Sequence, residues 1–313
     1  MAEANKWTTA DMSDQSGKVA LVTGGNGGLG YETVKELARK HARVVLACRS
    51  IDKGNAAREQ LLEQIPTATI EVMQLDLADL ASIRRFAESF KANHDLLHIL
   101  VNNAGVMATP RRTTADGFEL QFGTNHLGHF ALTGLLLDVL LKTPDSRVVS
   151  VSSIAEQMGS IKLDDLMGEK SYERWLAYGQ SKLANVLFAY ELQRKVSAVG
   201  ASTISLAVHP GVAATNLRTK LMTRETPLLH RIQSYFWETL RQSVEMGALP
   251  QLYAATASDV RGGEFYAPNG FLQRAGYPKK VRSSRRSYDE TIAKQLWAVS
   301  EELTGVEYTA LTQ

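Results

Sequence analysis

The chain has 313 residues, of which 44% are hydrophobic and 22% charged, a balance that suits a globular α/β protein with a sizeable core. Lys and Arg (35) nearly balance Asp and Glu (33), so the composition gives no support for a nucleic-acid or anionic-membrane partner. Cys48 is the single cysteine, which excludes an internal disulfide and a cysteine metal cluster, predicts no metal site and favours a reducing, cytoplasmic location.

The stretch 1–17 is predicted to be a polar N-terminal arm, because it contains no apolar run that could act as a signal peptide or membrane anchor. An apolar strand over 18–23 follows, and a helical pattern begins after Gly30. Between them lie five glycines in eight residues. Such a loop lets a pyrophosphate approach the backbone, and the next helix offers free N–H groups, so a dinucleotide site is predicted. Two spacings overlap in the loop, Gly25-x-Gly27-x-x-Gly30 and Gly24-x-x-x-Gly28-x-Gly30, and the loop alone does not choose between them.

The second predicted strand, 43–48, ends where a dinucleotide site distinguishes NAD from NADP. A carboxylate there would bind the ribose 2′-hydroxyl, whereas an arginine accepts a 2′-phosphate. Arg49 and Ser50 come next, Lys53 begins the following helix, and no carboxylate stands at the expected position. Because Arg49 would give a 2′-phosphate a charge-assisted hydrogen bond, the sequence predicts NADP(H) in preference to NAD(H).

Two further strands, 69–75 and 97–101, are followed by Asp76-Leu77 and by Asn102-Asn103-Ala104-Gly105. Ligands bind at the carboxyl edge of a parallel sheet, so these residues are predicted to border the cofactor. Residues 116–142 are predicted to form one long helical segment. Asn125 is a poor mid-helix residue, and we expect it to bend this helix or to hold a water molecule.

The fifth predicted strand, 146–153, ends in a pair of hydroxyl residues, Ser152 and Ser153. The helix after it carries Tyr178 and Lys182, four residues apart, so both side chains lie on one helix face. A nearby ammonium group favours the phenolate, so Lys182 is expected to lower the pKa of Tyr178. The pair therefore predicts a general acid or base that works near neutral pH.

A sixth strand, 203–208, leads into His209-Pro210-Gly211-Val212. Bulky apolar residues mixed with charges over 213–245 then predict a helical substrate lid. A small-residue helix over 247–257 and a last strand over 263–266 complete the pattern.

The C-terminal extension, 276–313, is predicted to carry a solvated basic run from Lys279 to Arg286 and a closing helix over 288–303. Before it, strands alternate with helices throughout. This alternation predicts one Rossmann-type α/β domain over 18–275, with a doubly wound, parallel, seven-stranded sheet.

Several of these motifs together, in this order, resemble the classical branch of the short-chain dehydrogenase/reductase family. The matching pieces are Thr23-Gly24 with Gly28 and Gly30, Asn102-Asn103-Ala104-Gly105, Asn125, Ser153, the Tyr178/Lys182 pair and Pro210-Gly211. A closer resemblance is to the retinol-dehydrogenase-like group and its soluble bacterial relatives. Its pieces are Ala47-Cys48-Arg49, Asn125-His126-Leu127-Gly128-His129-Phe130, Ser181-Lys182-Leu183-Ala184-Asn185, His209-Pro210-Gly211 and a long interval between Ser153 and Tyr178.

The resemblance implies NADP(H)-dependent interconversion of a ketone or aldehyde and an alcohol, and the apolar lid favours a lipophilic substrate. Tyr178 would transfer the proton, Ser153 (in preference to Ser152) would polarise the substrate oxygen, and Lys182 would lower the Tyr178 pKa and bind the nicotinamide ribose. Asn125 would hold a water that links Lys182 to solvent. The alternative from another class is a redox sensor or scaffold that binds NADP(H) without turnover. A sugar-nucleotide epimerase is disfavoured by the glycine and Asn-Asn-Ala-Gly patterns.

Cofactor contacts are expected along the carboxyl edge of the sheet. The residues are Gly24, Asn26, Gly28, Leu29, Gly30, Arg49, Ser50, Lys53, Asp76, Leu77, Asn102, Ala104, Gly105, Thr124, Tyr178, Lys182, Pro210, Gly211, Val212 and Thr215. The resemblance also implies homodimers or homotetramers that form through the long helices.

Overall fold

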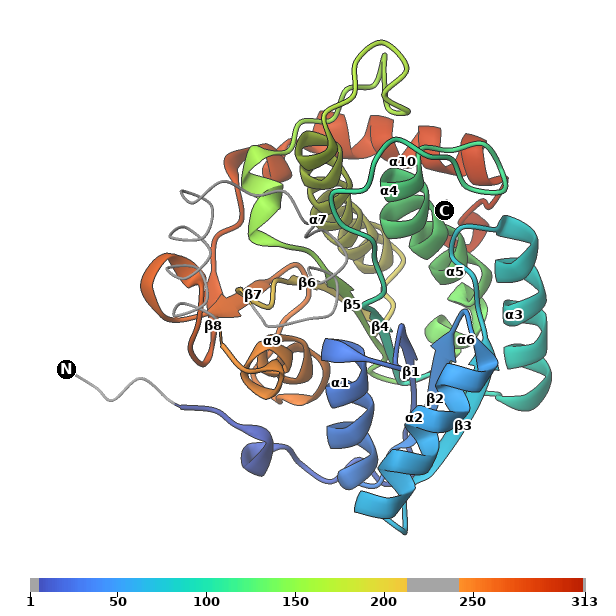
Figure 1. Ribbon diagram of the computed structural model, residues 1–313, viewed down its shortest axis with the longest axis vertical. Helices are drawn as coiled ribbons and strands as arrows, with labels where there is room; N and C mark the ends of the chain where they lie inside the picture. Colours follow the sequence, from blue (N-terminus) through green and yellow to red (C-terminus); the bar gives the residue numbers. More distant parts are fainter. Residues whose placement is uncertain (1–5, 213–241, 312–313) are drawn as a thin grey trace, which may run out of the picture.

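A single eight-stranded sheet runs through the protein, with the strand order β3-β2-β1-β4-β5-β6-β7-β8. The computed structural model describes residues 6–212 and 242–311 (Figure 1). The strands are β1 (Val19–Thr23), β2 (Arg43–Cys48), β3 (Thr69–Gln74), β4 (Ile99–Asn102), β5 (Arg147–Val151), β6 (Ile204–Val208), β7 (Phe265–Pro268) and β8 (Pro278–Val281). β1 to β7 pair in parallel, and β8 pairs antiparallel with β7. Their apolar runs reflect burial on both faces, as parallel sheets require.

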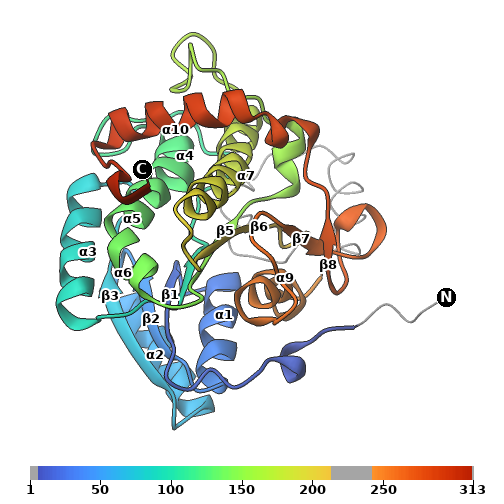
Figure 2. The ribbon, with the colours of Figure 1, turned by 180° about the vertical axis from the view of Figure 1, so that it is seen from behind.

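Helices cover both faces of the sheet, as Figures 1 and 2 show from opposite sides. One face carries α1 (Gly28–Arg39), α2 (Ile51–Gln64) and α9 (Val244–Thr256). The other carries α3 (Leu80–Asn93), α4 (Leu120–Phe122), α5 (Gly128–Leu135), α6 (Leu137–Lys142) and α7 (Arg174–Ala198). Short turns of 3-10 helix are η1 (Thr9–Asp11), η3 (Ile154–Met158), η4 (Phe271–Gln273), η5 (Arg285–Tyr288) and η6 (Thr309–Leu311). The doubly wound prediction is confirmed.

The C-terminal helix α10 (Glu290–Thr304) forms an outer layer across α5 and α7. Its Trp297 packs against Phe130 of α5 and Phe188 of α7, with ring centroids 5.1 and 5.8 Å apart. The buried Tyr308 hydroxyl, beyond α10, donates to the Phe130 carbonyl at 2.7 Å. The closing helix therefore belongs to the same core as the catalytic helix predicted from sequence.

The prediction of seven strands was wrong by one, because β8 lies in the basic run that was expected to be solvated. Lys279 and Lys280 are exposed, but their backbone pairs with β7 at the sheet edge. The Lys280 ammonium lies 2.5 Å from the Glu264 carboxylate. Lysines are compatible with an edge strand because one of its sides faces solvent, and they discourage edge-to-edge association.

The single long helix predicted over 116–142 is interrupted. It begins at Leu120, where the Glu119 carboxylate accepts hydrogen bonds from two helix N–H groups, and it breaks at Leu136. A π-helical turn, η2 (Gly123–Leu127), places Asn125 in the middle of the bend. The extra residue of a π turn explains why a regular helical pattern fails here.

Most of the predicted lid, residues 213–241, lies outside the described residues. Its last residues, 242–245, lead into α9, which begins at Val244 and not at 247 as predicted. The chain ends on either side of this range meet, because the Gln242 N–H donates to the Val212 carbonyl at 3.1 Å.

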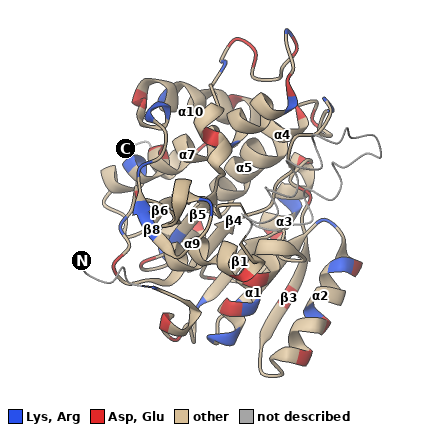
Figure 3. Ribbon diagram, turned by 60° about the vertical axis from the view of Figure 1, so that its left-hand side comes forward, with Lys and Arg blue, Asp and Glu red and all other residues tan. Residues whose placement is uncertain are grey.

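Charged side chains of both signs alternate along the outer helices α1 and α2, whereas α5 is free of them (Figure 3). Within 6–212 and 242–311, no helix combines the length and apolarity needed to cross a bilayer.

Candidate active site

The predicted catalytic side chains meet where β5 ends and η3 and α7 begin. Tyr178 and Lys182 are buried, and the Lys182 ammonium lies 5.8 Å from the centroid of the Tyr178 ring. The ammonium also donates to the Val151 carbonyl at 3.0 Å, which fixes it against the end of β5. The α7 helix therefore brings phenol and ammonium into one space, as their spacing predicted.

The two candidate serines point in different directions. The Ser152 hydroxyl donates to the Lys182 carbonyl at 2.7 Å and is buried beneath α7. Ser153 instead caps η3, where its hydroxyl accepts from the Ala155 N–H at 3.2 Å. The same hydroxyl lies near the Tyr178 phenol and lowers its pKa. This geometry favours Ser153 as the residue that faces a substrate oxygen.

The predicted lowering of the Tyr178 pKa by Lys182 is not what the structure shows. Burial raises the pKa of Tyr178 to about 12, and the nearby Ser153 hydroxyl opposes this rise only in part. Burial also lowers the pKa of Lys182 to about 8. Loss of hydration penalises the charged form of both groups and outweighs their mutual attraction.

Asn125 is held by the loop after β4 through both ends of its amide. Its oxygen accepts from the Val106 N–H at 2.8 Å, and its nitrogen donates to the Val106 carbonyl and to Ser181, each at 2.9 Å. Gly105 lies beside this amide, and a methyl group at Gly105 would stand 3.5 Å from the Lys182 nitrogen. The side chain of Asn125 thus shapes the wall next to Lys182, and its holding of a water molecule stays a prediction.

The glycine loop forms a cradle that fits a pyrophosphate. Gly24 and Gly28 have left-handed backbones (φ 68° and 55°), and a methyl group at Gly30 would meet the Gly24 carbonyl at 2.3 Å. A methyl group at Gly27 would meet open space. Side chains cap the N-termini of α2, α3, α7, α9 and α10. The N-cap residue of α1 is Gly27, which has no side chain that could cap the helix. The first N–H groups of α1 are therefore available to an anion.

Two of the residues predicted to hold the adenosine half, Arg49 and Asp76, line an open groove of about 580 Å³ between β3 and α3. Arg49 is exposed at the end of β2, and Lys53 is exposed in the first turn of α2. Ser50 caps that helix by accepting from the Lys53 N–H at 3.4 Å. Asp76 lines the groove, so a base and a 2′-phosphate could be held side by side here.

The loop predicted to meet the nicotinamide is held from two sides. The Val212 N–H donates to the Arg274 carbonyl at 2.8 Å, and Gln242 donates to the Pro210 carbonyl at 2.5 Å. Position 211 requires glycine for two reasons. Its φ of 67° is positive, and a methyl group there would meet the Arg274 carbonyl at 2.3 Å. Thr215 lies outside the described residues.

Other predicted contacts occupy the same edge, with exceptions. Asn26, Leu29, Ala104 and Gly105 are half-buried around the glycine loop. Asn102 points away, because its buried amide donates to Thr133 of α5 at 3.0 Å. Leu77 and Thr124 are also buried.

Sequence reasoning missed residues that connect the site to its surroundings. Gln273, with a left-handed backbone (φ 57°), accepts from His209 at 2.8 Å. Trp175 lies one helical turn before Tyr178 with its ring edge-on to the phenol, 6.4 Å between centroids. The spacing of Trp175 and Tyr178 was visible in the sequence, whereas the Gln273 contact depends on the β7–β8 turn.

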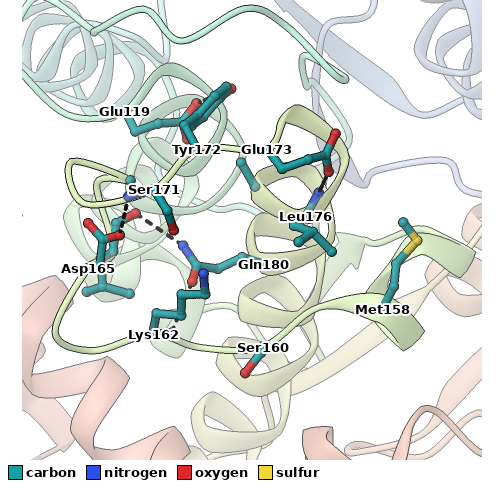
Figure 4. A pocket seen from close by; sticks show the side chains of 13 residues that line it. Glu119, Met158, Ser160, Lys162, Asp165, Ser171, Tyr172, Glu173, Leu176 and Gln180 are labelled. Atoms are coloured by element: carbon teal, nitrogen blue, oxygen red, sulfur yellow. Dashed lines mark hydrogen bonds between the residues drawn. The ribbon is translucent and has the colours of Figure 1, made fainter.

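A separate cavity of about 190 Å³ lies between the loop 160–173 and α7 (Figure 4). Ala177 and Gln180 line it, and they project about 100–160° around the helix from Tyr178. Gln180 accepts from the Lys162 N–H and donates to the Leu166 carbonyl. We attribute this cavity to the packing of the loop on α7, because no catalytic side chain lines it.

Comparison with known proteins shows the relationship directly. Residues 18–226 match the family described as short chain dehydrogenase. The chain is 42% identical over 294 residues to retinol dehydrogenase 12 of Mus musculus, covering 93% of this chain and 88% of that protein. It is 40% identical over 302 residues to polyprenol dehydrogenase of Danio rerio, with coverages of 95% and 90%.

Among solved structures, an uncharacterised protein from Mycobacterium paratuberculosis is 42% identical, with a TM-score of 0.80 and coverage of 97% of this chain and 99% of that one. The match extends beyond the dinucleotide half to the catalytic helix and the C-terminal layer. The protein is thus an oxidoreductase that acts on alcohol or carbonyl groups, and it belongs to the short-chain dehydrogenase family, within its retinol-dehydrogenase-like group.

Proposed function

We propose that the protein is an NADP(H)-dependent enzyme that interconverts a lipophilic aldehyde or ketone and its alcohol. The observation that carries this proposal is the meeting of Tyr178, Ser153 and Lys182 at the carboxyl edge of the sheet, beside the uncapped N-terminus of α1. A protein that only binds a cofactor has no need of a buried acid. This arrangement therefore favours turnover over the sensor or scaffold alternative.

Each side chain has a distinct task in this proposal. NADPH, when bound, supplies the hydride. The Tyr178 phenol, protonated at neutral pH because burial raises its pKa to about 12, gives its proton to the carbonyl oxygen. Ser153 donates to the same oxygen and stabilises the charge that develops there. Lys182, fixed by the Val151 carbonyl, places a positive charge beside the phenol and within reach of the nicotinamide ribose.

The preference for NADP(H) is supported by the charge around the end of β2. Arg49 and Lys53 are exposed there, and Arg49 lines the open groove beside β3. Arginine binds a 2′-phosphate through two N–H groups in a planar fork. The 2′-hydroxyl of NAD(H) would gain no comparable interaction.

A lipophilic substrate is supported by the surface beside Tyr178. Trp175 is 38% exposed although it is a large aromatic residue, and its indole borders the phenol. The similar proteins named above are called retinol and polyprenol dehydrogenases, whose named substrates are isoprenoid alcohols. We propose an extended apolar alcohol or aldehyde of this kind.

A homodimer or homotetramer that forms through the long helices stays a prediction. α10 packs across α5 and α7, so such an assembly would have to accommodate this outer helix. A cytoplasmic location remains a prediction.

The test is NADPH consumption by the purified protein with a panel of carbonyl compounds that includes all-trans-retinal, long aliphatic aldehydes and short polar ketones. We expect turnover with NADPH that increases with the apolar length of the substrate. Tight NADPH binding with no turnover across the panel would instead support the sensor or scaffold.

A further inference from the structure

His129, in the first turn of α5, is buried and has no role in the reaction proposed above. Its Nδ1 lies 3.0 Å from the carbonyl oxygen of Asn125, and its Nε2 lies 2.9 Å from the Thr23 hydroxyl. Burial and, to a smaller extent, the positive charge of Lys182 lower the pKa of His129 to about 4, although the hydrogen bond to the Asn125 carbonyl opposes this shift. The ring is therefore a neutral bridge between two segments that are far apart in the sequence.

The contacts allow only one neutral tautomer. A carbonyl oxygen can only accept, so Nδ1 carries the hydrogen and donates to Asn125. Nε2 of the neutral ring can then only accept, and it lies 2.9 Å from the Thr23 hydroxyl, closer than the Val101 carbonyl, which that hydroxyl also faces at 3.4 Å. The hydroxyl oxygen in turn accepts from the Asn103 and Ala104 N–H groups, each at 2.9 Å. The direction of each hydrogen bond in this chain is thus defined.

The bridge joins three pieces of the wall around Lys182. Thr23 ends β1 at the start of the glycine loop, and its hydroxyl holds the turn after β4. Asn125 lies in the π turn, and its amide holds Val106 and the hydroxyl of Ser181, the residue before Lys182. A shift of the π turn relative to β1 would therefore move Asn125 and the wall beside Lys182.

We propose that His129 is a positioning residue, which holds the π turn carrying Asn125 in register with the glycine loop and thereby keeps Lys182 aligned with a bound cofactor. This inference rests on the proposed NADP(H) function. The imidazole suits the task because one rigid ring can donate a hydrogen bond at one nitrogen and accept one at the other. It therefore reaches both the Asn125 carbonyl, one helical turn earlier, and the Thr23 hydroxyl. A Phe at this position would fill the space but remove both hydrogen bonds of the ring.

The first test is spectroscopic and needs no substrate. Long-range ¹⁵N–¹H NMR of the histidine-labelled protein distinguishes the two neutral tautomers. We expect His129 to carry its hydrogen on Nδ1 between pH 6 and 8. His126 and His209 serve as internal references, because each should carry its hydrogen on Nε2. The Nε2 atom of His126 faces the Ser300 hydroxyl, which donates its own hydrogen to the Leu296 carbonyl. The Nε2 atom of His209 faces the side-chain oxygen of Gln273. Finding the hydrogen of His129 on Nε2, or a charged ring, would overturn the proposal.

The second test compares His129→Phe with His126→Phe. Both histidines are buried in the same helical segment, but His126 faces Ser300 of α10 and lies away from the site. We expect His129→Phe to raise the Kd for NADPH and to lower kcat with retinal by about 100-fold, since small misplacements of reacting groups have effects of this size. His126→Phe should lower the melting temperature with kcat and the NADPH Kd close to wild type. Equal effects of the two variants on kcat and Kd would show that His129 is merely structural.

The Kd comparison separates this inference from the proposed function. If the wild-type protein turns over no carbonyl compound, the proposed reaction is wrong, and the NADPH Kd of the two variants still decides the role of His129. If His129→Phe does not fold, Thr23→Val removes the same bond from its other end, and Thr23→Ser restores the hydroxyl. Recovery of NADPH affinity in Thr23→Ser relative to Thr23→Val is expected. Equal affinities in these two variants would refute the bridge.

Discussion

Replacing Tyr178 by Phe removes one hydroxyl from the site and leaves its packing in place. The ring is 9% exposed and lies against Trp175, contacts that Phe retains. The phenol is neutral at pH 7 in the folded protein, so no buried charge is created or lost. The free energy of unfolding should therefore change by less than about 1 kcal/mol.

The effect on turnover should be far larger. General acid catalysis by a positioned group contributes about 10²–10⁴-fold, which corresponds to roughly 3–5 kcal/mol of activation free energy. The Ser153 hydroxyl and the charge of Lys182 remain, so a residual rate above the uncatalysed reaction is expected. NADPH affinity should be nearly unchanged, because the phenol is one contact among many along the cofactor groove.

The assay is single-turnover NADPH oxidation with saturating retinal, beside urea unfolding and NADPH titration. Tyr172→Phe is the matched control, because its hydroxyl bonds to the Thr109 carbonyl at 2.9 Å and to the Glu119 carboxylate at 3.1 Å, on the other side of α7. It should lose stability and keep its rate. A Tyr178→Phe enzyme that retains more than about a tenth of the wild-type rate would refute the assignment of the acid.

Three further outcomes are expected. Arg49→Ala should weaken the affinity for NADPH by about 10–100-fold, since a charge-assisted hydrogen bond contributes about 1.5–3 kcal/mol, and should leave the affinity for NADH within about twofold. Both Kd values are measured by fluorescence, and equal losses of affinity would contradict the role of Arg49. Because the Tyr178 pKa is raised to about 12 and the Lys182 pKa is lowered to about 8, both groups keep their protons below about pH 7, and carbonyl reduction should be independent of pH between about 5 and 7. Alcohol oxidation, which needs the phenolate, should rise about tenfold per pH unit over the same range in initial-rate assays, and parallel profiles would contradict the raised Tyr178 pKa. Tyr308→Phe should cost about 1–2 kcal/mol in urea unfolding through the lost bond to the Phe130 carbonyl, with kcat unaffected, and an unchanged midpoint would show that this bond is dispensable.

The elements that could be predicted from the sequence are those whose signal is local. A strand of apolar residues followed by glycines predicts a phosphate-binding loop from a few neighbouring residues. A tyrosine four residues before a lysine likewise predicts that the two side chains share one helix face. For this reason the placement of the Tyr178/Lys182 pair and of the loop at Gly24 agrees with expectation. The carboxyl edge follows from the parallel connections between such strands.

The features that escaped prediction depend on partners distant in sequence. β8 is a strand because β7 offers it a free edge, and its lysines alone read as a solvated run. The Tyr178 pKa depends on how completely the surrounding fold excludes water, which spacing cannot reveal. The bridging role of His129 likewise requires Thr23, more than a hundred residues away in the sequence, to lie beside it.

The bond between Val212 and Gln242 bears on how such an enzyme can diversify. The backbone contact closes the scaffold at the point where 213–241 leaves and returns, and Gln242 also binds the Pro210 carbonyl and the Gly276 N–H. The position of Gly211 is therefore tied to the β7–β8 turn and to Gln242. If the prediction of a substrate lid over 213–241 holds, we expect substitutions there to change which substrates are accepted and to leave the loop at Gly211 in place.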